Sequence, residues 1–242
     1  MVEMGHRYSY ILNVTQLLIL DVGFNEDENM GTDKATLVNL SNLENTSVIE
    51  MQPFFDRLPQ TAHADGTYRL RRYSIVKFHH GFLEILPESN FVQSSEVNHF
   101  QGDVIREFDG IERSLLESDA MHAVCKLFAE NTGLTSGNKI EIHQIRILAD
   151  GNSVPSAPEG IHQDGFSHVA IVAINRENAA GGEFQVFRSP DSSPILNLTL
   201  DNGEVALVDD HSLWHYASPL KPIDNNKPAI WDLFVLTTRG DA

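Results

Sequence analysis

The sequence predicts a β-rich α+β fold, and three observations lead to this prediction. The second half of the chain holds several short segments rich in Ile, Val and Phe, which are typical of β-strands. Glycine-containing turns rather than helical patterns separate these segments, which favours an antiparallel sandwich or barrel. The clearest helical pattern, within residues 118–133, precedes these segments. We therefore expect helices of the first half to pack against a β-rich C-terminal core.

One strand and one helix before residue 139 can be assigned from the sequence. Residues 68–78 combine basic with apolar side chains and predict a strand. Ser118 is the expected N-cap of the helix and Gly133 its C-terminal stop. Apolar residues recur between them at helical spacing: Met121, Val124, Cys125 and Phe128. Cys125 is therefore expected in the core rather than as a nucleophile, whereas residues 22–66 give no clear assignment.

The second half predicts five strands, which turns such as Gly181-Gly182 and Asp201-Asn202-Gly203 separate. The expected strands are residues 139–148, 168–174, 183–187, 204–208 and 229–237. No repeat, low-complexity tract or linker divides the chain. We therefore expect a single domain over residues 1–242, with its core at about 139–238 and a variable N-terminal part at 1–65.

Composition and charge exclude several classes of function. The 242 residues include 17 Lys and Arg against 34 Asp and Glu, which gives a formal net charge of −17. Such a chain repels phosphate groups, so we expect it to bind neither nucleic acid nor a membrane surface. The apolar stretch at residues 8–20 is too short to span a bilayer and lacks the flanks of a signal peptide. With a single cysteine, no internal disulfide is expected, and the prediction is a cytoplasmic protein.

The histidines contain one pattern that suits a metal ion. His162 and Asp164 stand two residues apart just before the strand that begins at His168, so both side chains project to the same side of an extended segment. His215 follows the strand at 204–208. Two imidazoles and one carboxylate form the facial triad of non-haem Fe(II) oxygenases, which leaves coordination positions open for cosubstrate and oxygen. The sequence contains no His-Glu-x-x-His, Gly-x-Ser-x-Gly or phosphate-loop pattern.

Six segments between about residues 66 and 240 carry a resemblance to a known family. The first is residues 158–165, which read Pro-Glu-Gly-Ile-His-Gln-Asp-Gly. The others are Arg71-Arg72-Tyr73-Ser74, Ile105-Arg106-Glu107-Phe108, His143-Gln144-Ile145-Arg146, Asn175-Arg176-x-Asn178 followed by Gly181-Gly182, and Asp209-Asp210 leading to His215 and Ser218-Pro219. In their order along the chain, these segments resemble the 2-oxoglutarate-dependent oxygenases related to bacterial L-isoleucine dioxygenase.

The resemblance implies a double-stranded β-helix core, which is a jelly-roll of the cupin-like kind. It implies Fe(II), the cosubstrate 2-oxoglutarate, O2, and hydroxylation of an aliphatic C–H of a free L-amino acid or close derivative, with release of succinate and CO2. His162, Asp164 and His215 would be the catalytic metal ligands. His211 competes with His215, but the family places this ligand between the aspartate pair and the Ser-Pro, which selects His215. Asp164 favours hydroxylation, because related halogenases lack this carboxylate.

The sequence departs from the family at the expected anchor of 2-oxoglutarate. The family usually opens its last core strand with Arg-Asp, where the arginine binds the far carboxylate bidentately; here the pair is Trp231-Asp232. Arg146 and Lys227 are the alternative cations, with Arg146 favoured because a polar residue on an apolar strand face requires a partner. Trp231 and Ser218 complete the expected cosubstrate site, and Arg176 is expected to be structural.

The substrate site follows from the same matched segments. Arg71, Arg72 and Arg106 are candidates to bind the carboxylate of a small-molecule amino acid, and Tyr73 to shape its pocket. His143 is expected to be a hydrogen-bonded structural histidine. The sequence is compatible with assembly as a homodimer. The alternative function is a jelly-roll metal-binding protein without oxygenase activity, which the missing arginine supports; for a hydrolytic zinc enzyme the sequence offers no convincing general base.

Overall fold

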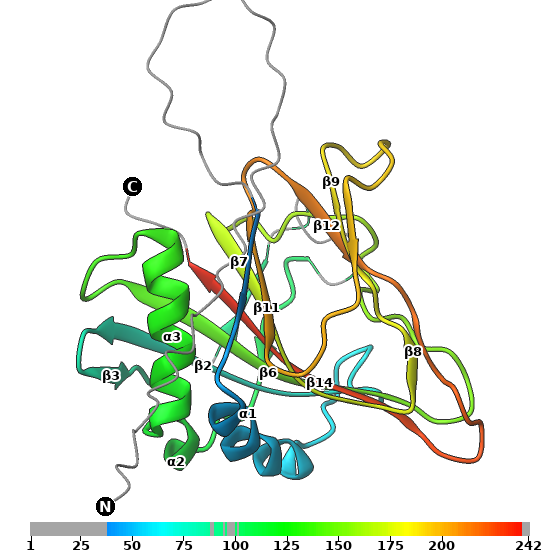
Figure 1. Ribbon diagram of the computed structural model, residues 1–242, viewed down its shortest axis with the longest axis horizontal. Coiled ribbons are helices and arrows are strands. Elements are labelled where there is room, and N and C mark those ends of the chain that lie inside the picture. Colours follow the sequence, from blue (N-terminus) through cyan, green and yellow to red (C-terminus); the bar gives the residue numbers. More distant parts are fainter. Residues whose placement is uncertain (1–37, 88–89, 94, 96–99, 101, 239–242) are drawn as a thin grey trace, which may run out of the picture.

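The computed structural model describes residues 38–87, 90–93, 95, 100 and 102–238. Its main element is an antiparallel seven-stranded sheet of order β1-β11-β7-β14-β6-β2-β3 (Figure 1). These strands are β1 (Val38–Asn42), β2 (Arg69–His79), β3 (Phe82–Ile85), β6 (Lys139–Ala149), β7 (His168–Glu177), β11 (Glu204–Asp209) and β14 (Ala229–Thr238). The β-rich α+β prediction is confirmed, and the strands expected in this sheet are present.

A second, smaller sheet of order β10-β9-β12 faces the large one. Its strands are β9 (Phe184–Phe187), β10 (Leu196–Leu198) and β12 (Trp214–Ala217). After β7 the chain enters the second sheet at β9 and β10, returns to the large sheet at β11, crosses to the second sheet at β12 and ends in the large sheet at β14. This crossing between two facing sheets is the winding of a jelly-roll. Two short strand pairs complete the strands: β8 (Ala179–Gly181) with β13 (Leu220–Pro222), and β4 (Asn90–Phe91) with β5 (Arg106–Glu107).

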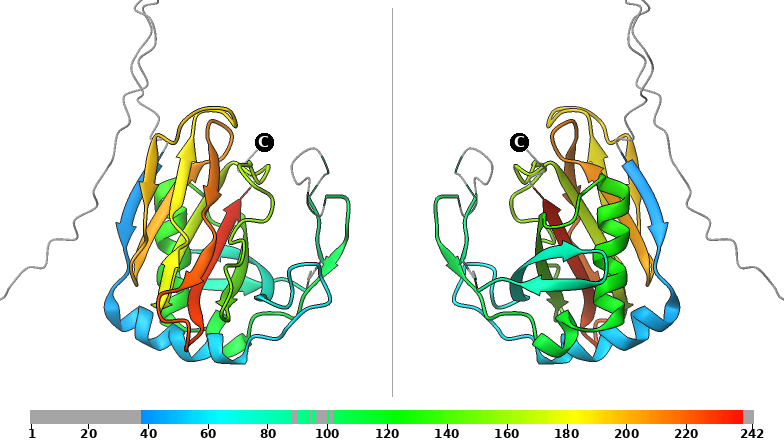
Figure 2. Two further views of the ribbon diagram at one scale, coloured as in Figure 1. Left: turned by 90° about the vertical axis from the view of Figure 1, so that its right-hand side faces the viewer. Right: turned by 90° about the vertical axis from the view of Figure 1, so that its left-hand side faces the viewer.

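Helices cover the other face of the large sheet (Figure 2). They are α1 (Asn45–Met51), the 3-10 helix η1 (Gln52–Arg57), α2 (Arg113–Leu116) and α3 (Asp119–Thr132). The predicted ends of α3 are confirmed, because the Ser118 hydroxyl accepts the N–H of Met121 at 3.1 Å and Gly133 adopts a left-handed conformation with φ of 69°. Cys125 is a core residue as predicted, and burial raises the pKa of its thiol to about 12.

Side chains of the large sheet alternate between its two faces, and this alternation decides which of them reach the space between the sheets. In β2, β6 and β14, odd-numbered residues such as Ile145 and Leu233 point toward the second sheet. Even-numbered residues such as Ile142 and Phe234 pack under the helices. A register shift in the pairing of β7 with β14 lies beside Leu233.

The prediction for the N-terminal part can be compared with the structure only in part. Within residues 22–66, which the sequence left unassigned, the structure places β1, α1 and η1. The apolar stretch at residues 8–20 lies outside the described residues. Among the helices that the structure describes, none has the length and apolar character needed to cross a bilayer.

Candidate metal centre and adjoining cavity

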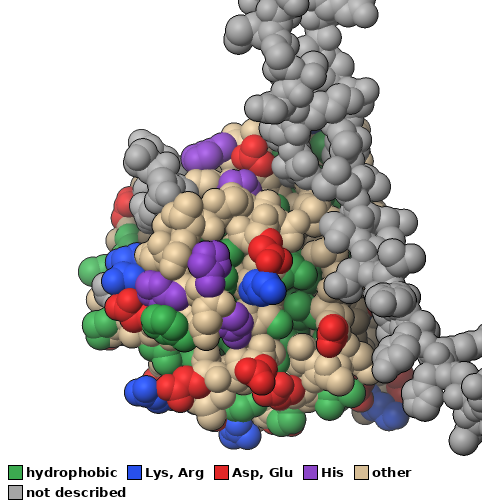
Figure 3. All heavy atoms as spheres, turned by 60° about the vertical axis from the view of Figure 1, so that its left-hand side comes forward, with side chains coloured by type: hydrophobic (Ala, Val, Ile, Leu, Met, Phe, Trp, Pro, Cys, Tyr) green, Lys and Arg blue, Asp and Glu red, His purple; other side chains and the backbone are tan. Residues whose placement is uncertain are grey.

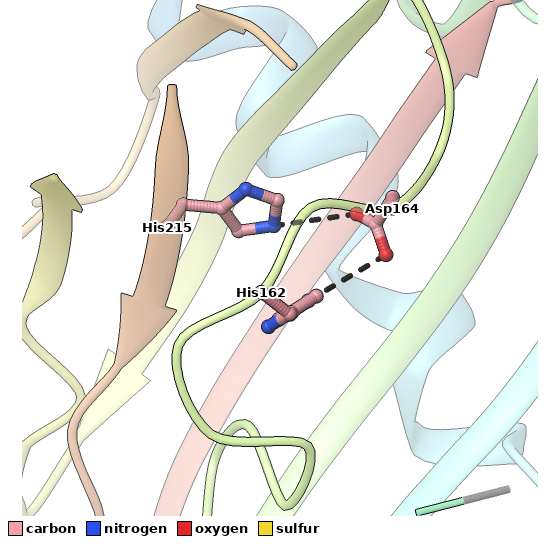
Figure 4. A group of neighbouring side chains, drawn as sticks. All are labelled: His162, Asp164 and His215. Carbon is pink, nitrogen blue, oxygen red and sulfur yellow. Dashed lines mark ion pairs between the residues drawn. The ribbon is translucent and has the colours of Figure 1, made fainter. Parts of the chain in front are cut away.

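The three predicted metal ligands lie together (Figure 4). One ligand atom from each of His162, Asp164 and His215 lies within 4.8 Å of the others. The Nε2 atom of His162 is 3.5 Å from one carboxylate oxygen of Asp164, and the Nε2 atom of His215 is 3.3 Å from the other. Two imidazole nitrogens and a carboxylate oxygen suit a non-haem Fe(II) ion, so these residues fit the metal that the sequence predicts.

Backbone pairing brings the two histidines to the same place. His162, in the loop between β6 and β7, forms an isolated antiparallel bridge with His215 of β12. The His162 N–H donates to the His215 carbonyl at 3.0 Å, and the His215 N–H donates back at 2.8 Å. Residues directly opposite in an antiparallel pair project to the same face, and the two ring centroids are accordingly 4.4 Å apart. The second sheet thus extends through this bridge to the ligand segment.

The carboxylate of Asp210 holds the loop that carries Asp164. Asp210 is only 1% exposed. Its oxygens accept three consecutive backbone N–H groups, those of Asp164 at 3.0 Å, Gly165 at 2.8 Å and Phe166 at 3.1 Å. Because three hydrogen bonds join this buried carboxylate to the backbone of residues 164–166, the loop that carries Asp164 is held in position. The aspartate pair belonged to the segments that carried the family resemblance, but its spacing did not disclose this role.

The outer nitrogens of both histidines face oxygen atoms, although only the Nδ1 atom of His162 is within hydrogen-bonding geometry. The Nδ1 atom of His215 lies 3.4 Å from an Asp210 oxygen, and the Nδ1 atom of His162 lies 2.8 Å from the carbonyl oxygen of Gly160. A histidine that donates Nδ1–H to an oxygen presents the lone pair of Nε2 to a metal. The geometry of His162 agrees with this role, and the Nε2 atoms of both rings point toward Asp164 at the shared centre.

Charge pairing governs protonation at the centre. Burial by itself would raise the pKa of Asp164, but hydrogen bonds from His162 and His215 outweigh it and hold that pKa well below its usual range. Burial would lower the pKa of His215, yet the carboxylates of Asp164 and Asp210 raise it to about 10. A divalent cation at this centre would replace the proton shared between imidazole and carboxylate.

A cavity adjoins the three ligands between the sheets. Of the residues predicted to bind cosubstrate or substrate, Arg71, Arg106 and Trp231 line it. His143 also lines the cavity. The wall contains four further polar residues for which the sequence offered no role in binding: Arg69, Gln93, Ser156 and Glu159. Apolar side chains of the large sheet, such as Ile145 and Leu233, form much of the remainder.

Arg146, the favoured cosubstrate anchor, lies on the helix-covered face of β6. Its guanidinium forms a two-pronged pair with Asp232, at 2.6 and 2.8 Å, and also lies 3.0 Å from Asp56. The partner that this polar residue was expected to require is therefore a pair of carboxylates. Arg72 lies on the same face of the neighbouring strand, where it donates to the Gly110 carbonyl at 2.8 Å.

The other predicted residues also lie away from the lining of the cavity. Lys227 is exposed in the turn before β14. The Ser218 hydroxyl donates to the Glu183 carboxylate and accepts the Glu183 N–H at 3.0 Å. Tyr73 projects toward the cavity side of β2, where its hydroxyl donates to Glu141 at 2.6 Å and its ring lies 4.6 Å from that of His143. His211 is exposed in a turn.

The β4–β5 pair is connected to the metal centre through Gln93. The side-chain amide of Gln93 donates to Asp164 Oδ1 at 2.9 Å and accepts from Arg106 at 2.9 Å. The Arg106 guanidinium also lies over the Phe91 ring, 4.6 Å from its centroid. No local pattern in the sequence indicates Gln93, because the residues it joins are brought together only by the fold.

His143 is buried in the cavity wall. Burial, together with the nearby charges of Arg71 and Arg106, holds its pKa well below its usual range, so the imidazole is neutral. Among the described residues, none forms a hydrogen bond with its Nδ1 atom. The expectation of a hydrogen-bonded structural histidine therefore stays a prediction for this side chain.

Comparisons with known proteins agree with this site. A family model described as 2OG-Fe dioxygenase matches residues 52–237. The chain is 29% identical over 167 residues to L-isoleucine-4-hydroxylase of Bacillus thuringiensis, which covers 65% of this chain and 69% of the relative. It is 26% identical over 197 residues to 3(1)-hydroxy-L-isoleucine 4-dioxygenase of Pantoea ananatis, which covers 78% and 79%.

A solved structure gives the corresponding result for the fold. A bsmA homologue from Methylobium petroleophilum superposes with a TM-score of 0.68 at 29% identity, over 80% of this chain and 81% of that one. The predicted jelly-roll core is confirmed by this match and by the strand order. With a family model that spans most of the chain, the chain belongs to the 2OG-Fe dioxygenase family, which uses Fe(II), 2-oxoglutarate and O2.

Proposed function

We propose that this dioxygenase hydroxylates an aliphatic C–H of a free L-amino acid or a close derivative. The observation that carries the proposal is the composition of the cavity wall next to His162, Asp164 and His215. This wall contains arginines, the carboxylate of Glu159 and a row of apolar side chains. A free amino acid has a carboxylate, an ammonium group and a side chain, which match these three features. The relatives named for isoleucine and hydroxyisoleucine support the same substrate class.

The charges around the cavity favour a substrate without net charge. Three buried arginines, Arg69, Arg71 and Arg106, are matched in number by the carboxylates of Asp65, Glu159 and Asp164, while the Asp210 carboxylate is compensated by three backbone N–H groups. An Fe(II) dication and a 2-oxoglutarate dianion leave this balance unchanged. A further ligand with net charge would bring an unpaired charge into a buried site, which costs several kcal/mol. A zwitterion brings none, so a free amino group is favoured over an acylated one.

Two residues of this wall suit the charged ends of such a zwitterion. Arg106 is 2% exposed and is linked to Asp164 through Gln93, which places its guanidinium beside the metal centre. Glu159 lies three residues before His162 and 3.5 Å from Arg69. We assign the substrate carboxylate to Arg106 and the ammonium group to Glu159.

The iron centre and the chain have separate tasks in this reaction. Bound Fe(II), with 2-oxoglutarate and O2, supplies the oxidant that attacks an unactivated C–H bond. His162, Asp164 and His215 would hold the ion, and Asp210 would keep the Asp164 loop and the His215 ring in place. Arg106 and Glu159 would fix the two charged ends of the substrate, so that only its side chain can approach the metal.

The test compares L-amino acids with their N-acetyl derivatives, scored by release of succinate from the Fe(II)-loaded protein. The proposal predicts release with at least one free aliphatic amino acid and little with its N-acetyl form. Release with acetylated substrates alone would contradict the zwitterion assignment. Bound iron without succinate release from any substrate would instead favour a metal-binding protein without oxygenase activity, the alternative that Trp231 supports.

A further inference from the structure

The three arginines of the cavity differ in how their charges are satisfied. Arg69 donates to Asp65 at 2.9 Å and lies 3.5 Å from Glu159. Arg106 donates to Gln93 at 2.9 Å. The guanidinium of Arg71, in contrast, forms neither a hydrogen bond nor an ion pair with any residue that the structure describes; it lies over the ring of Phe108, 5.2 Å from the centroid.

Arg71 is nevertheless buried, with 6% of its surface exposed. A buried guanidinium without an anionic partner is destabilising, because it has lost its hydration without gaining a counter-charge. Burial and the neighbouring charges of Arg69 and Arg106 lower the pKa of Arg71 to about 9, which still leaves it charged at neutral pH. Such a site is stable when a ligand supplies the missing anion.

Arg71 lines the cavity from the large sheet. In the large sheet Arg71 lies directly opposite Ile145 of β6, and Ile145 lies opposite Leu233 of β14. All three residues line the cavity, so they form one row across the large sheet on the face that is turned toward the second sheet. Arg106 instead projects from β5, outside both main sheets.

We propose that Arg71 binds the distal carboxylate of 2-oxoglutarate in this protein. The inference rests on the cosubstrate of the family and on the candidate metal centre, but not on the identity of the amino-acid substrate. In this assignment the positive charge comes from β2, which lies two strands away from β14 in the sheet. On β14, Trp231 occupies the family's usual anchor position with a neutral indole. Trp231 and Leu233 then form an apolar wall beside the carbon chain of the cosubstrate.

Two other arginines of the large sheet, Arg146 and Arg176, do not line the cavity. Arg146 is paired with Asp232 and Asp56 on the opposite face of the sheet. Arg176 packs over the ring of Trp231, 5.6 Å from its centroid, and donates to the carbonyl of Gly181. Neither side chain belongs to the described lining of the cavity, whereas Arg71 does.

The test is a binding cycle without amino acid and without oxygen. Calorimetric titration of the Mn(II)-loaded full chain gives the Kd for 2-oxoglutarate and for 2-oxopentanoate, which keeps the metal-binding end but lacks the distal carboxylate. We expect the wild type to prefer 2-oxoglutarate roughly 10- to 100-fold, the range of a charge-assisted hydrogen bond. The R71Q variant should lose this preference and keep its affinity for 2-oxopentanoate.

A matched control lies next to Arg71 on the same strand. R72Q removes the same type of charge from the opposite face and should leave both Kd values unchanged. A wild-type preference retained in R71Q would overturn the inference, as would a wild type that does not distinguish the two oxo acids. If R71Q binds neither oxo acid, the R71K variant takes its place in the test. The lysine supplies only a point charge, so R71K should prefer 2-oxoglutarate less strongly than wild type does. An unchanged preference for 2-oxoglutarate in R71K would contradict the role of Arg71. Failure of the succinate panel alone would contradict the amino-acid substrate and leave this result standing.

Discussion

The function of a single arginine here depends on which face of its strand it occupies. Arg71 and Arg72 are neighbours in one matched segment, yet one lines the cavity and the other contacts the Gly110 carbonyl outside it. Arg146 differs from the cavity-facing Ile145 by one position and is thereby directed to Asp232. A strand pattern predicts alternation, but only the tertiary packing shows which face encloses the site. For this reason the sequence indicated the correct strands but not which arginine faces the cavity.

Asp210 provides a test of how the metal ligands are held. D210N keeps the shape of the side chain but removes the charge beside His215 and weakens the acceptor of three N–H groups. We expect the affinity for Mn(II) to fall about 10- to 100-fold, as is typical for partners of ligating histidines, measured by calorimetry. D209N is the control, because the side-chain hydrogen bonds that the structure describes for Asp209 go to His211 and Ser212 of the turn and not to the metal ligands. Equal metal affinity in D210N and wild type would contradict the role of Asp210.

Because His143 is buried and neutral, the stability of the folded protein should depend on pH. Its pKa in the folded state lies well below the usual value, so below about pH 6.5 the unfolded chain takes up a proton that the folded chain does not. Stability should therefore fall as the pH drops below that value. H143F should show a smaller decrease in Tm between pH 7 and pH 5 than wild type. Removal of the exposed His80 in H80N should leave the decrease as it is; an identical decrease in H143F would refute the assignment.

Among the elements of the fold, length and regularity determine what the sequence could predict. The helix α3 and the long strands β2, β6 and β14 carry sustained apolar patterns and were expected close to their observed positions. The strands β4, β5, β8 and β13 have only two or three residues, which is too short for any periodicity. These short strands form because the fold brings partner segments alongside them, and their own residues do not predict this pairing.

The helix α3 should stabilise the sheet without taking part in binding. Phe128 is buried in the core cluster between α3 and the large sheet, on the face opposite the cavity. F128A should lower the free energy of unfolding by about 3–5 kcal/mol, measured by urea denaturation. The folded variant should keep wild-type Mn(II) affinity. K126A, which truncates an exposed residue of the same helix, should leave stability nearly unchanged; a large loss of metal affinity in folded F128A would show coupling that the structure does not support.

In the molecule as a whole, the net charge of −17 and the cavity are separate features. Charged side chains are dispersed among neutral ones on the face that carries α3 (Figure 3), whereas three of the 17 basic residues lie buried around one cavity. The metal ligands could be predicted, because two of them share a local spacing within recognisable segments. Gln93, Glu159 and Asp210 could not, since their contacts join segments that are distant along the chain.

The central claim is that His162, Asp164 and His215 form an iron centre to which 2-oxoglutarate chelates. Anaerobic addition of Fe(II) and 2-oxoglutarate tests it directly by visible absorption spectroscopy, because an iron-bound keto acid gives a charge-transfer band. The account predicts this band in the wild-type protein and its absence in H162A. The absence of the band in wild type with iron shown to be bound, or an undiminished band in H162A, would contradict it.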